Sequence, residues 1–143
     1  MDNDQWNARA DLRILNYEAG MLRIALVEDE ADLRELIQEE LEDAGFEVHP
    51  AADGKQGYDL ILHLKPDLIL SDINMPGMNG FQMRRALQEA GMEHAETPFI
   101  FISAFADQTD IAEGLVVGAD HYVTKPIDFD ALIAWARKLT SAA

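Results

Sequence analysis

Short apolar runs alternate with longer amphipathic stretches from Leu22 to Leu139, and this order restricts the chain to few folds. Unbroken apolar runs are typical of strands buried on both faces of a sheet, whereas apolar residues three and four positions apart are typical of helices. Five such pairs in strict alternation imply right-handed crossovers and a parallel sheet covered by helices on both faces. The sequence therefore predicts one doubly wound α/β domain, since 143 residues are too few for two ordinary domains.

The expected strands are Leu22–Val27, Phe46–Ala51, Leu68–Asp72, Pro98–Ser103 and His121–Thr124. The expected helices are Glu30–Ala44, Asp53 to about Leu64, Gly80 to about Ala90, about Gln108 to Val117, and Asp128 to about Leu139. The first helix is expected to turn one apolar stripe toward the sheet, formed by Leu33, Leu36, Ile37 and Leu41. Gly45 is expected to end this helix, and Asp53 and Asn79 are expected to cap the second and third helices.

Residues 1–20 form an N-terminal extension ahead of the domain, which is expected to occupy residues 21–143. Apolar residues recur at helical spacing in this extension, at Trp6, Ala10, Ile14 and Tyr17. Two interpretations stay open: a helix that docks on the domain or on a partner, and an extension with little fixed structure.

The composition excludes several classes of function. The chain has no cysteine, which removes disulfides, thiol catalysis and thiolate metal sites and fits a reducing compartment. No apolar run approaches the ~18 residues of a membrane span, and the polar, acidic start of the chain is unlike a secretory signal, so a cytoplasmic protein without membrane insertion is expected. The formal net charge of −16 opposes direct binding to nucleic acid, because phosphate backbones attract basic surfaces.

The stretch Asp67–Gly80, DLILSDINMPGMNG, carries the most distinctive chemistry. Its apolar first half delivers Asp72 to the carboxyl end of a strand. The proline, the glycines and the asparagine that follow are typical of a tight loop. A carboxylate in this position projects into the crevice where open α/β sheets bind their ligands. We therefore interpret Asp72 as the reactive group.

Polar residues also stand at three of the other strand ends: Glu28 and Asp29 at the first, Ser103 at the fourth, and Lys125 at the fifth. These ends share one edge of a parallel sheet, so the carboxylates, the hydroxyl and the ammonium group are expected to meet there. Clustered carboxylates repel unless a cation lies among them, and hard oxygen ligands favour Mg²⁺. An aspartate so placed can accept a phosphoryl group as an acyl phosphate, while the metal and the lysine neutralise the developing charge.

In combination these motifs resemble the receiver domains of bacterial two-component response regulators, the chemotaxis-regulator-like domains. The resemblance covers Leu22 to about Leu139. It rests on Glu28-Asp29, on Asp72 before Met75–Gly80, on Ser103-Ala104, and on Tyr122 ahead of Lys125-Pro126. It implies a flavodoxin-like fold, a five-stranded parallel sheet with strand order 2-1-3-4-5.

The resemblance also implies roles for the acidic residues. Asp72 would be the phosphoacceptor, and Asp29 and Asp72 would bind Mg²⁺ directly. Asn74 would give its backbone carbonyl to the metal, and Glu28 would act through water.

By the same resemblance, Lys125 would contact the phosphoryl group and form a cis bond to Pro126. Ser103 and Tyr122 would be the switch pair, the hydroxyl moving toward the phosphoryl group while the aromatic ring turns inward.

Two residues depart from the commonest family pattern. Glu28 replaces the more usual aspartate, in a contact that the family makes through water. Ser103 replaces threonine and keeps the hydroxyl. Phe105 stands where the family tunes the lifetime of its phosphoryl group, and a bulky ring there would hinder the attacking water.

The expected function is a phosphorylation-activated signalling switch that takes its phosphoryl group from a histidine kinase or histidine phosphotransfer protein. It would catalyse its own phosphorylation, but turnover is not its purpose. A downstream protein target is expected at the face of residues 108–117, 121–124 and 128–139. Trp135 on this face is either an interface residue or a cover for the sheet edge.

Alternatives of other classes use the same residue types. A haloacid dehalogenase-type phosphatase also has an aspartate nucleophile, but it needs a second aspartate two residues later, where this chain has Asn74. A pseudo-receiver that only binds a partner would lack the acidic pair or the lysine. The protein is expected to be either a single-domain regulator or the receiver of a hybrid kinase or larger regulator.

Overall fold

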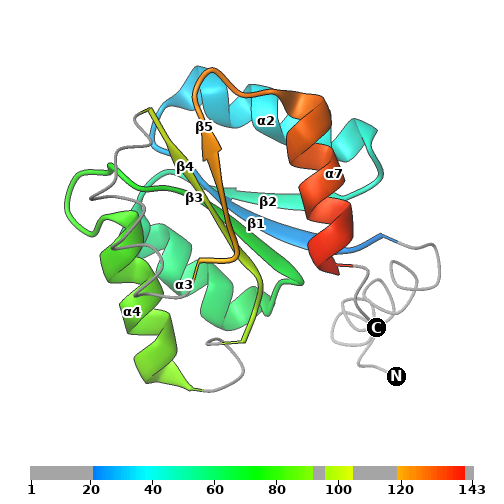
Figure 1. The fold of residues 1–143 in the computed structure, drawn as a ribbon. Coiled ribbons are helices and arrows are strands. Elements are labelled where there is room, and N and C mark those ends of the chain that lie inside the picture. The colour runs from blue at the N-terminus through cyan, green and yellow to red at the C-terminus, as the bar shows by residue number, and fades with distance from the viewer. Residues whose placement is uncertain (1–20, 92–95, 105–118, 141–143) are drawn as a thin grey trace, which may run out of the picture.

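The computed structural model describes residues 21–91, 96–104 and 119–140. Five strands lie in these ranges: β1 (Arg23–Val27), β2 (Glu47–Ala51), β3 (Leu68–Asp72), β4 (Phe99–Ser103) and β5 (His121–Thr124). The helices described are α2 (Ala31–Asp43), α3 (Gly54–Leu64), α4 (Gly80–Ala90) and α7 (Phe129–Thr140) (Figure 1). The helix expected over residues 108–117 and the extension of residues 1–20 lie outside the described residues.

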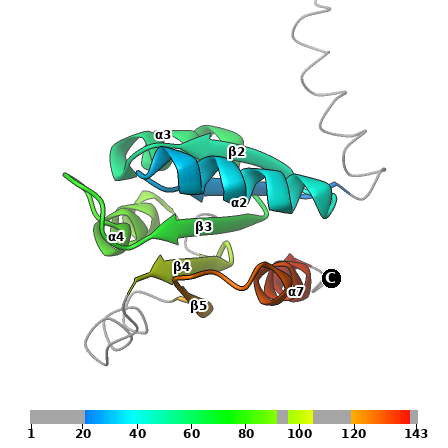
Figure 2. The same ribbon diagram turned by 90° about the horizontal axis from the view of Figure 1, so that it is seen from above.

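The strands form one parallel sheet in the order β2-β1-β3-β4-β5, with β2 and β5 at its opposite edges (Figure 2). The predicted fold class and strand order are confirmed. The register aligns Asp72 with Ile102 and Ser103 with Thr124. Because all strands point the same way, their carboxyl ends lie together along one edge.

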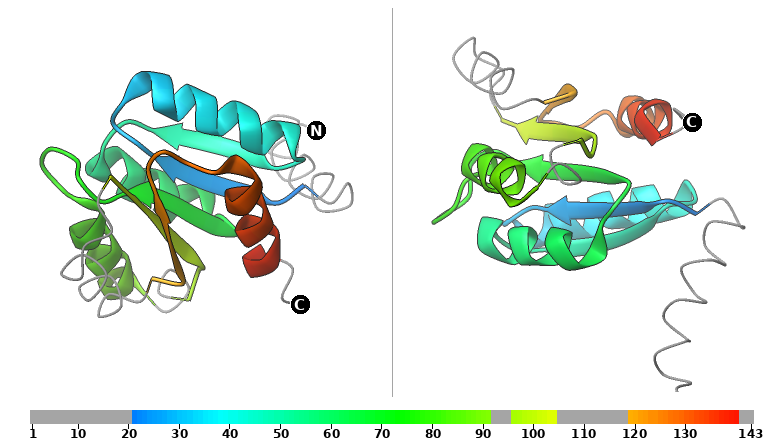
Figure 3. Two further views of the ribbon diagram at one scale, coloured as in Figure 1. Left: turned by 45° about the horizontal axis from the view of Figure 1, so that its top comes forward. Right: turned by 90° about the horizontal axis from the view of Figure 1, so that it is seen from below.

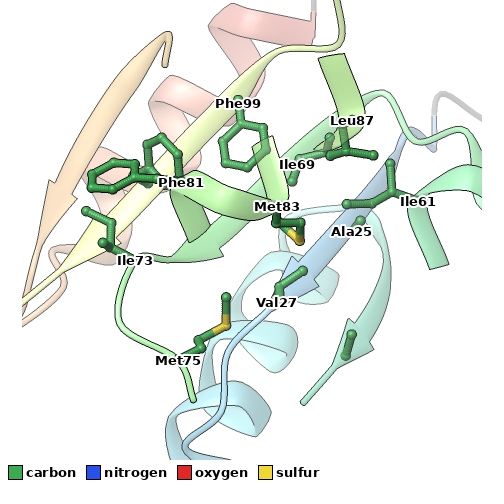
Figure 4. Close-up of a cluster of buried hydrophobic side chains, with 12 residues drawn as sticks. Ala25, Val27, Ile61, Ile69, Ile73, Met75, Phe81, Met83, Leu87 and Phe99 are labelled. Atoms are coloured by element: carbon green, nitrogen blue, oxygen red, sulfur yellow. The ribbon is translucent and has the colours of Figure 1, made fainter. Parts of the chain in front are cut away.

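Helices cover both faces of the sheet (Figures 1 and 3). The helices α3 and α4 cover one face, where Ala25 and Val27 of β1 join a cluster that includes Phe99 and Phe101 (Figure 4). The helices α2 and α7 cover the other face and pack on a second cluster, which receives Ile24 of β1. Since alternate residues of one strand enter different cores, an unbroken apolar run is the pattern that such a strand requires.

Local signals account for the ends of the helices. The Asp53 side chain accepts a hydrogen bond from the Gln56 backbone N–H at 2.8 Å and caps α3. Asn79 caps α4 in a reciprocal arrangement with Gln82, so two backbone donors of the first turn are satisfied. Gly45 follows the end of α2 with φ of 102°, a backbone conformation that favours glycine. The three expected helix signals are thus confirmed.

One expected core residue is exposed. Ile37 and Leu41 of α2 are fully buried and Leu33 is partly buried, but 44% of Leu36 is accessible to solvent. Leu36 directly precedes Ile37, so its side chain is turned about 100° away around the helix axis. The apolar stripe of α2 is therefore wider than the part of the helix that reaches the sheet, and the prediction that Leu36 faces the core was wrong.

Among the helices that the structure describes, none is both long enough and apolar enough to cross a membrane.

The different burial of Leu41 and Leu36 in α2 predicts different effects on stability. Leu41→Ala is expected to destabilise the domain by roughly 2–5 kcal/mol, because it leaves a cavity in a closed core. Leu36→Ala is expected to cost about 1 kcal/mol or less, since its side chain is largely in solvent. Denaturant unfolding of both variants gives the two values, and equal losses would show that Leu36 is buried in solution.

Candidate acidic site at the carboxyl edge of the sheet

Three carboxylates meet where β1 and β3 end. Glu28 and Asp29 follow the last residue of β1, and Asp72 is the last residue of β3. One oxygen of each carboxylate lies within 4.8 Å of the other two. Glu28 is fully buried, Asp72 is 4% exposed, and Asp29 is open to solvent. The predicted convergence of these three residues is confirmed.

Lys125 reaches this cluster from beyond the edge strand β5. Its Nζ atom donates a hydrogen bond to Asp72 Oδ2 at 3.1 Å and lies 3.4 Å from Glu28 Oε1. The backbone N–H of Lys125 donates to the Ser103 carbonyl at 2.8 Å, which continues the pairing of β4 and β5 beyond the last strand residue. The bond between Lys125 and Pro126 is cis, as the resemblance implied. One ammonium group is thus shared by two buried carboxylates.

The two carboxylate oxygens of Glu28 have different partners. Its Oε2 atom accepts a hydrogen bond from the Glu30 backbone N–H at 3.0 Å, and its own carbonyl accepts one from the Arg34 guanidinium at 2.8 Å. Its Oε1 atom is buried and accepts no hydrogen bond from the residues described, although the Lys125 ammonium lies within ion-pair distance. Arg34 was not singled out from the sequence, since nothing in its spacing shows that it reaches the end of β1.

The donor set fits a divalent cation with hard oxygen ligands. Three carboxylates lie together, and the ammonium group found beside them among the described residues, that of Lys125, pairs with Glu28 and Asp72. Glu28 keeps one buried oxygen without a hydrogen-bond donor in this part of the chain. Mg²⁺ prefers carboxylate and carbonyl oxygens and retains several waters, so an open acidic cluster of this kind suits it.

The electrostatics of the site appear in two pKa shifts. Burial raises the pKa of Glu28 to about 7, and the charge of Asp72 adds to the rise. The hydrogen bond from Glu30 and the charge of Lys125 oppose it without cancelling it. Burial alone would lower the pKa of Lys125, but the hydrogen bond and charge of Asp72, together with Glu28, outweigh burial and raise it. The ammonium form of Lys125 is therefore the stable one beside Asp72.

Three of the remaining predicted residues lie on β4, on β5 and in the loop after β3. Ser103 is 1% exposed at the end of β4, the strand next to β3. Tyr122 of β5 is half-buried, with its ring centroid 5.7 Å from that of Phe101. Asn74 is exposed in the loop that leaves Asp72. Phe105 lies outside the residues that the structure describes.

Comparison with known proteins shows consistent similarity. The family model for the response regulator receiver domain matches residues 24–137. The transcriptional regulatory protein DltR of Streptococcus agalactiae is 41% identical over 119 residues, which are 83% of this chain and 52% of DltR. The chain spans about half the length of the curated relatives it matches.

Solved structures with the same fold are also similar. The chemotaxis protein CheY4 of Vibrio cholerae has a TM-score of 0.79 at 29% identity, covering 83% of this chain and 98% of CheY4. The response regulator TrrA of Thermotoga maritima, solved in complex with Mg²⁺ and BeF, has a TM-score of 0.74 at 30% identity. That match covers 83% of this chain and 99% of TrrA.

The pKa of Glu28 predicts how stability depends on pH without metal. A carboxyl whose pKa is raised by folding contributes stability that is complete below its unfolded pKa of 4.5 and is lost as pH rises through the folded pKa of about 7. Glu28→Gln keeps the shape of the side chain and stays neutral at every pH. The stability of this variant relative to wild type is therefore expected to increase as pH rises from about 5 to 8.

Denaturant unfolding at several pH values in the presence of a chelator measures this difference. Glu39→Gln, at an exposed position of α2, is the matched control and is expected to follow the wild-type pH dependence. A difference between Glu28→Gln and wild type that does not change with pH would contradict the assigned shift.

Proposed function

Because the chain belongs to the response regulator receiver domain family, we propose that it is a switch activated by phosphorylation of Asp72. The observation that carries this proposal is the Asp72 carboxylate itself. It lies in a cluster of three carboxylates with its Oδ2 atom 3.1 Å from the Lys125 ammonium. This arrangement combines a nucleophilic oxygen with a fixed positive charge at the edge where parallel sheets bind ligands.

The proposed donor is a phosphohistidine of a histidine kinase or phosphotransfer protein. An oxygen of Asp72 attacks the phosphorus, the P–N bond breaks, and the electron pair stays on the imidazole nitrogen, which takes up a proton. The product is an acyl phosphate on Asp72. Lys125 stabilises the negative charge that the transferred oxygens carry, because its ammonium group is already held beside the attacking Asp72 carboxylate.

The proposed metal is Mg²⁺, which would neutralise charge on the phosphoryl oxygens when bound. Asp29 and Asp72 would hold it directly, Asn74 through its backbone carbonyl, and Glu28 through water. TrrA, which is similar in fold and sequence, was solved in complex with Mg²⁺ and BeF, and this supports Mg²⁺ as the metal.

The proposed switch pair is Ser103 and Tyr122. Ser103 lies on β4 beside the strand that carries Asp72, and Tyr122 lies one strand further out, against Phe101. A hydroxyl drawn toward a phosphoryl group on Asp72 would leave room for the ring of Tyr122 to turn inward.

As predicted from the sequence, a downstream protein target would bind at residues 108–117, β5 and α7, of which the structure describes β5 and α7. Trp135 of α7 stacks on His121 of β5, with ring centroids 3.9 Å apart and an interplanar angle of 19°, and Lys138 lies 4.7 Å from the Trp135 ring centroid. This geometry favours the interpretation of Trp135 as a cover for the edge strand, which also makes it a reporter of any movement of β5. A protein target is preferred to nucleic acid because the chain has a formal net charge of −16.

The family match and Asn74 favour this function over a haloacid dehalogenase-type phosphatase. Two receiver arrangements stay open, a single-domain regulator and the receiver of a larger regulator or hybrid kinase. DltR, about twice the length that is matched here, is an example of a longer relative.

Asp72→Asn is expected to abolish phosphorylation by a small phosphodonor with Mg²⁺, because an amide fills the same space but is a poor nucleophile. Asp59→Asn, at an exposed position of α3, is the matched control and is expected to be labelled like wild type. Intact-mass measurement after incubation gives the label. An acid-labile phosphoryl group on Asp72→Asn at the wild-type rate would overturn the assignment.

Mg²⁺ is expected to raise the melting temperature, and Asp29→Ala is expected to remove most of this rise. A ligand that binds only the folded state adds roughly 2.7 kcal/mol of stability at a hundredfold excess over its Kd. Asp32→Ala, three residues further on and also exposed, is the control and is expected to keep the wild-type shift. Equal Mg²⁺-dependent shifts in wild type and Asp29→Ala would exclude Asp29 as a direct ligand.

Phosphorylation is expected to change the fluorescence of Trp135, because a movement of β5 alters the stack on His121. The measurement uses a Trp6→Phe background, in which Trp135 is the remaining tryptophan. The same background with Asp72→Asn is the control and is expected to give no change. Full phosphorylation without a fluorescence change would disprove the coupling, whatever the chemistry at Asp72.

A further inference from the structure

A backbone hydrogen bond closes the loop between Asp72 and α4. The Gly80 backbone N–H donates a hydrogen bond to the Ile73 carbonyl at 2.8 Å, which ties the two ends of the loop together. A Cβ atom on Gly80 would lie 2.5 Å from the Asp72 carbonyl oxygen. The start of α4 therefore packs directly on the backbone of the proposed phosphoacceptor.

The inner side of this loop is fixed by the core. Ile73 is 2% exposed and Met75 is 7% exposed, and both side chains belong to the cluster under α3 and α4 (Figure 4). Gly77 reverses the chain with φ of 77° and has no atom within 4 Å of its would-be Cβ. The loop therefore has packed core beneath Ile73 and Met75 and open space beside Gly77.

A second close approach comes from α3. Gly54 is the buried first residue of this helix, directly after the capping residue Asp53. A Cβ atom on Gly54 would overlap the Met78 carbonyl oxygen and lie 2.9 Å from the Met78 carbonyl carbon. Both atoms belong to the backbone, so no side-chain rotation can relieve the overlap.

The backbone of Gly54 does not itself require glycine, since it lies in a helix and has no positive φ. Alanine has the higher helix propensity at an ordinary helical position. What excludes a larger residue here is the closeness of α3 to the loop at Met78.

We propose that Gly54 is a positioning residue for the acidic site: its missing side chain lets α3 hold the Ile73–Asn79 loop against the end of β3. This inference rests on the proposed function, because Asn74, the proposed backbone ligand of Mg²⁺, belongs to the same closed loop. A side chain at position 54 pushes Met78 outward. Since Ile73 and Gly80 are joined, the displacement passes into the residues between them, including Asn74.

The first test compares Gly54→Ala with Asp53→Ala by calorimetric titration with MgCl₂. Asp53→Ala removes the cap of the same helix and adds no atom next to the loop, so it is expected to lower the melting temperature and keep the wild-type Mg²⁺ affinity. Gly54→Ala is expected to lower the affinity roughly tenfold or more, as changes to residues that orient metal ligands do. Equal affinities in Gly54→Ala and wild type would overturn the proposal.

The second test needs no metal. In the chelated protein, amide hydrogen exchange at Gly80 reports its bond to Ile73, and Gly54→Ala is expected to speed this exchange relative to Asp53→Ala. If wild type binds no Mg²⁺, the metal part of the proposed function fails, and exchange at Gly80 alone decides the role of Gly54. Unchanged protection of Gly80 would then overturn that role.

If Gly54→Ala is unfolded in buffer, both measurements are made for all proteins in trimethylamine N-oxide, which favours the folded state.

Discussion

At the carboxyl edge of the sheet, buried negative charge exceeds the nearby positive charge. The rest of the structure depends on how this excess is compensated. Glu28 is fully buried and Asp72 nearly so, and Lys125 lies close to both carboxylates. A buried carboxylate without a partner is costly, because water cannot screen it. The position of Lys125 therefore decides whether the two buried carboxylates have a partner. That position depends on how β5 is aligned with β4 and β3.

The apolar cores on the two faces of the sheet maintain this alignment. All five residues of β3 and all five of β4 are buried, so each strand is packed on both sides. The free energy gained by burying apolar surface is large but does not depend on direction. Hydrogen bonds and charges, in contrast, specify which ends of the strands meet. In this domain the cores supply the stability, and polar residues at or just past the strand ends form the acidic site.

The sequence predicted the strands, the helix caps and the meeting of Glu28, Asp29, Asp72 and Lys125, because these depend on local patterns and on parallel topology. It was wrong about Leu36, since helical spacing does not tell how wide a stripe the sheet covers. Among the features that could not be predicted from it are the complete burial of Glu28 and the contact of Gly54 with the loop at Met78. Both features arise where elements distant in sequence pack together. The sequence around Gly54 does not show that this residue approaches the backbone of another loop.

The pairing of Asp72 with Lys125 joins residues 53 positions apart, and this separation bears on how the chain assembles during its synthesis. Translation proceeds from the N-terminus, so the ribosome releases Glu28, Asp29 and Asp72 before Lys125. A nascent sheet of β1, β2 and β3 would gather three carboxylates without the Lys125 ammonium group, which follows β5. Without a bound cation, their mutual repulsion would disfavour closure of this edge until Lys125 arrives. The same charges that serve the completed site therefore act against its premature assembly.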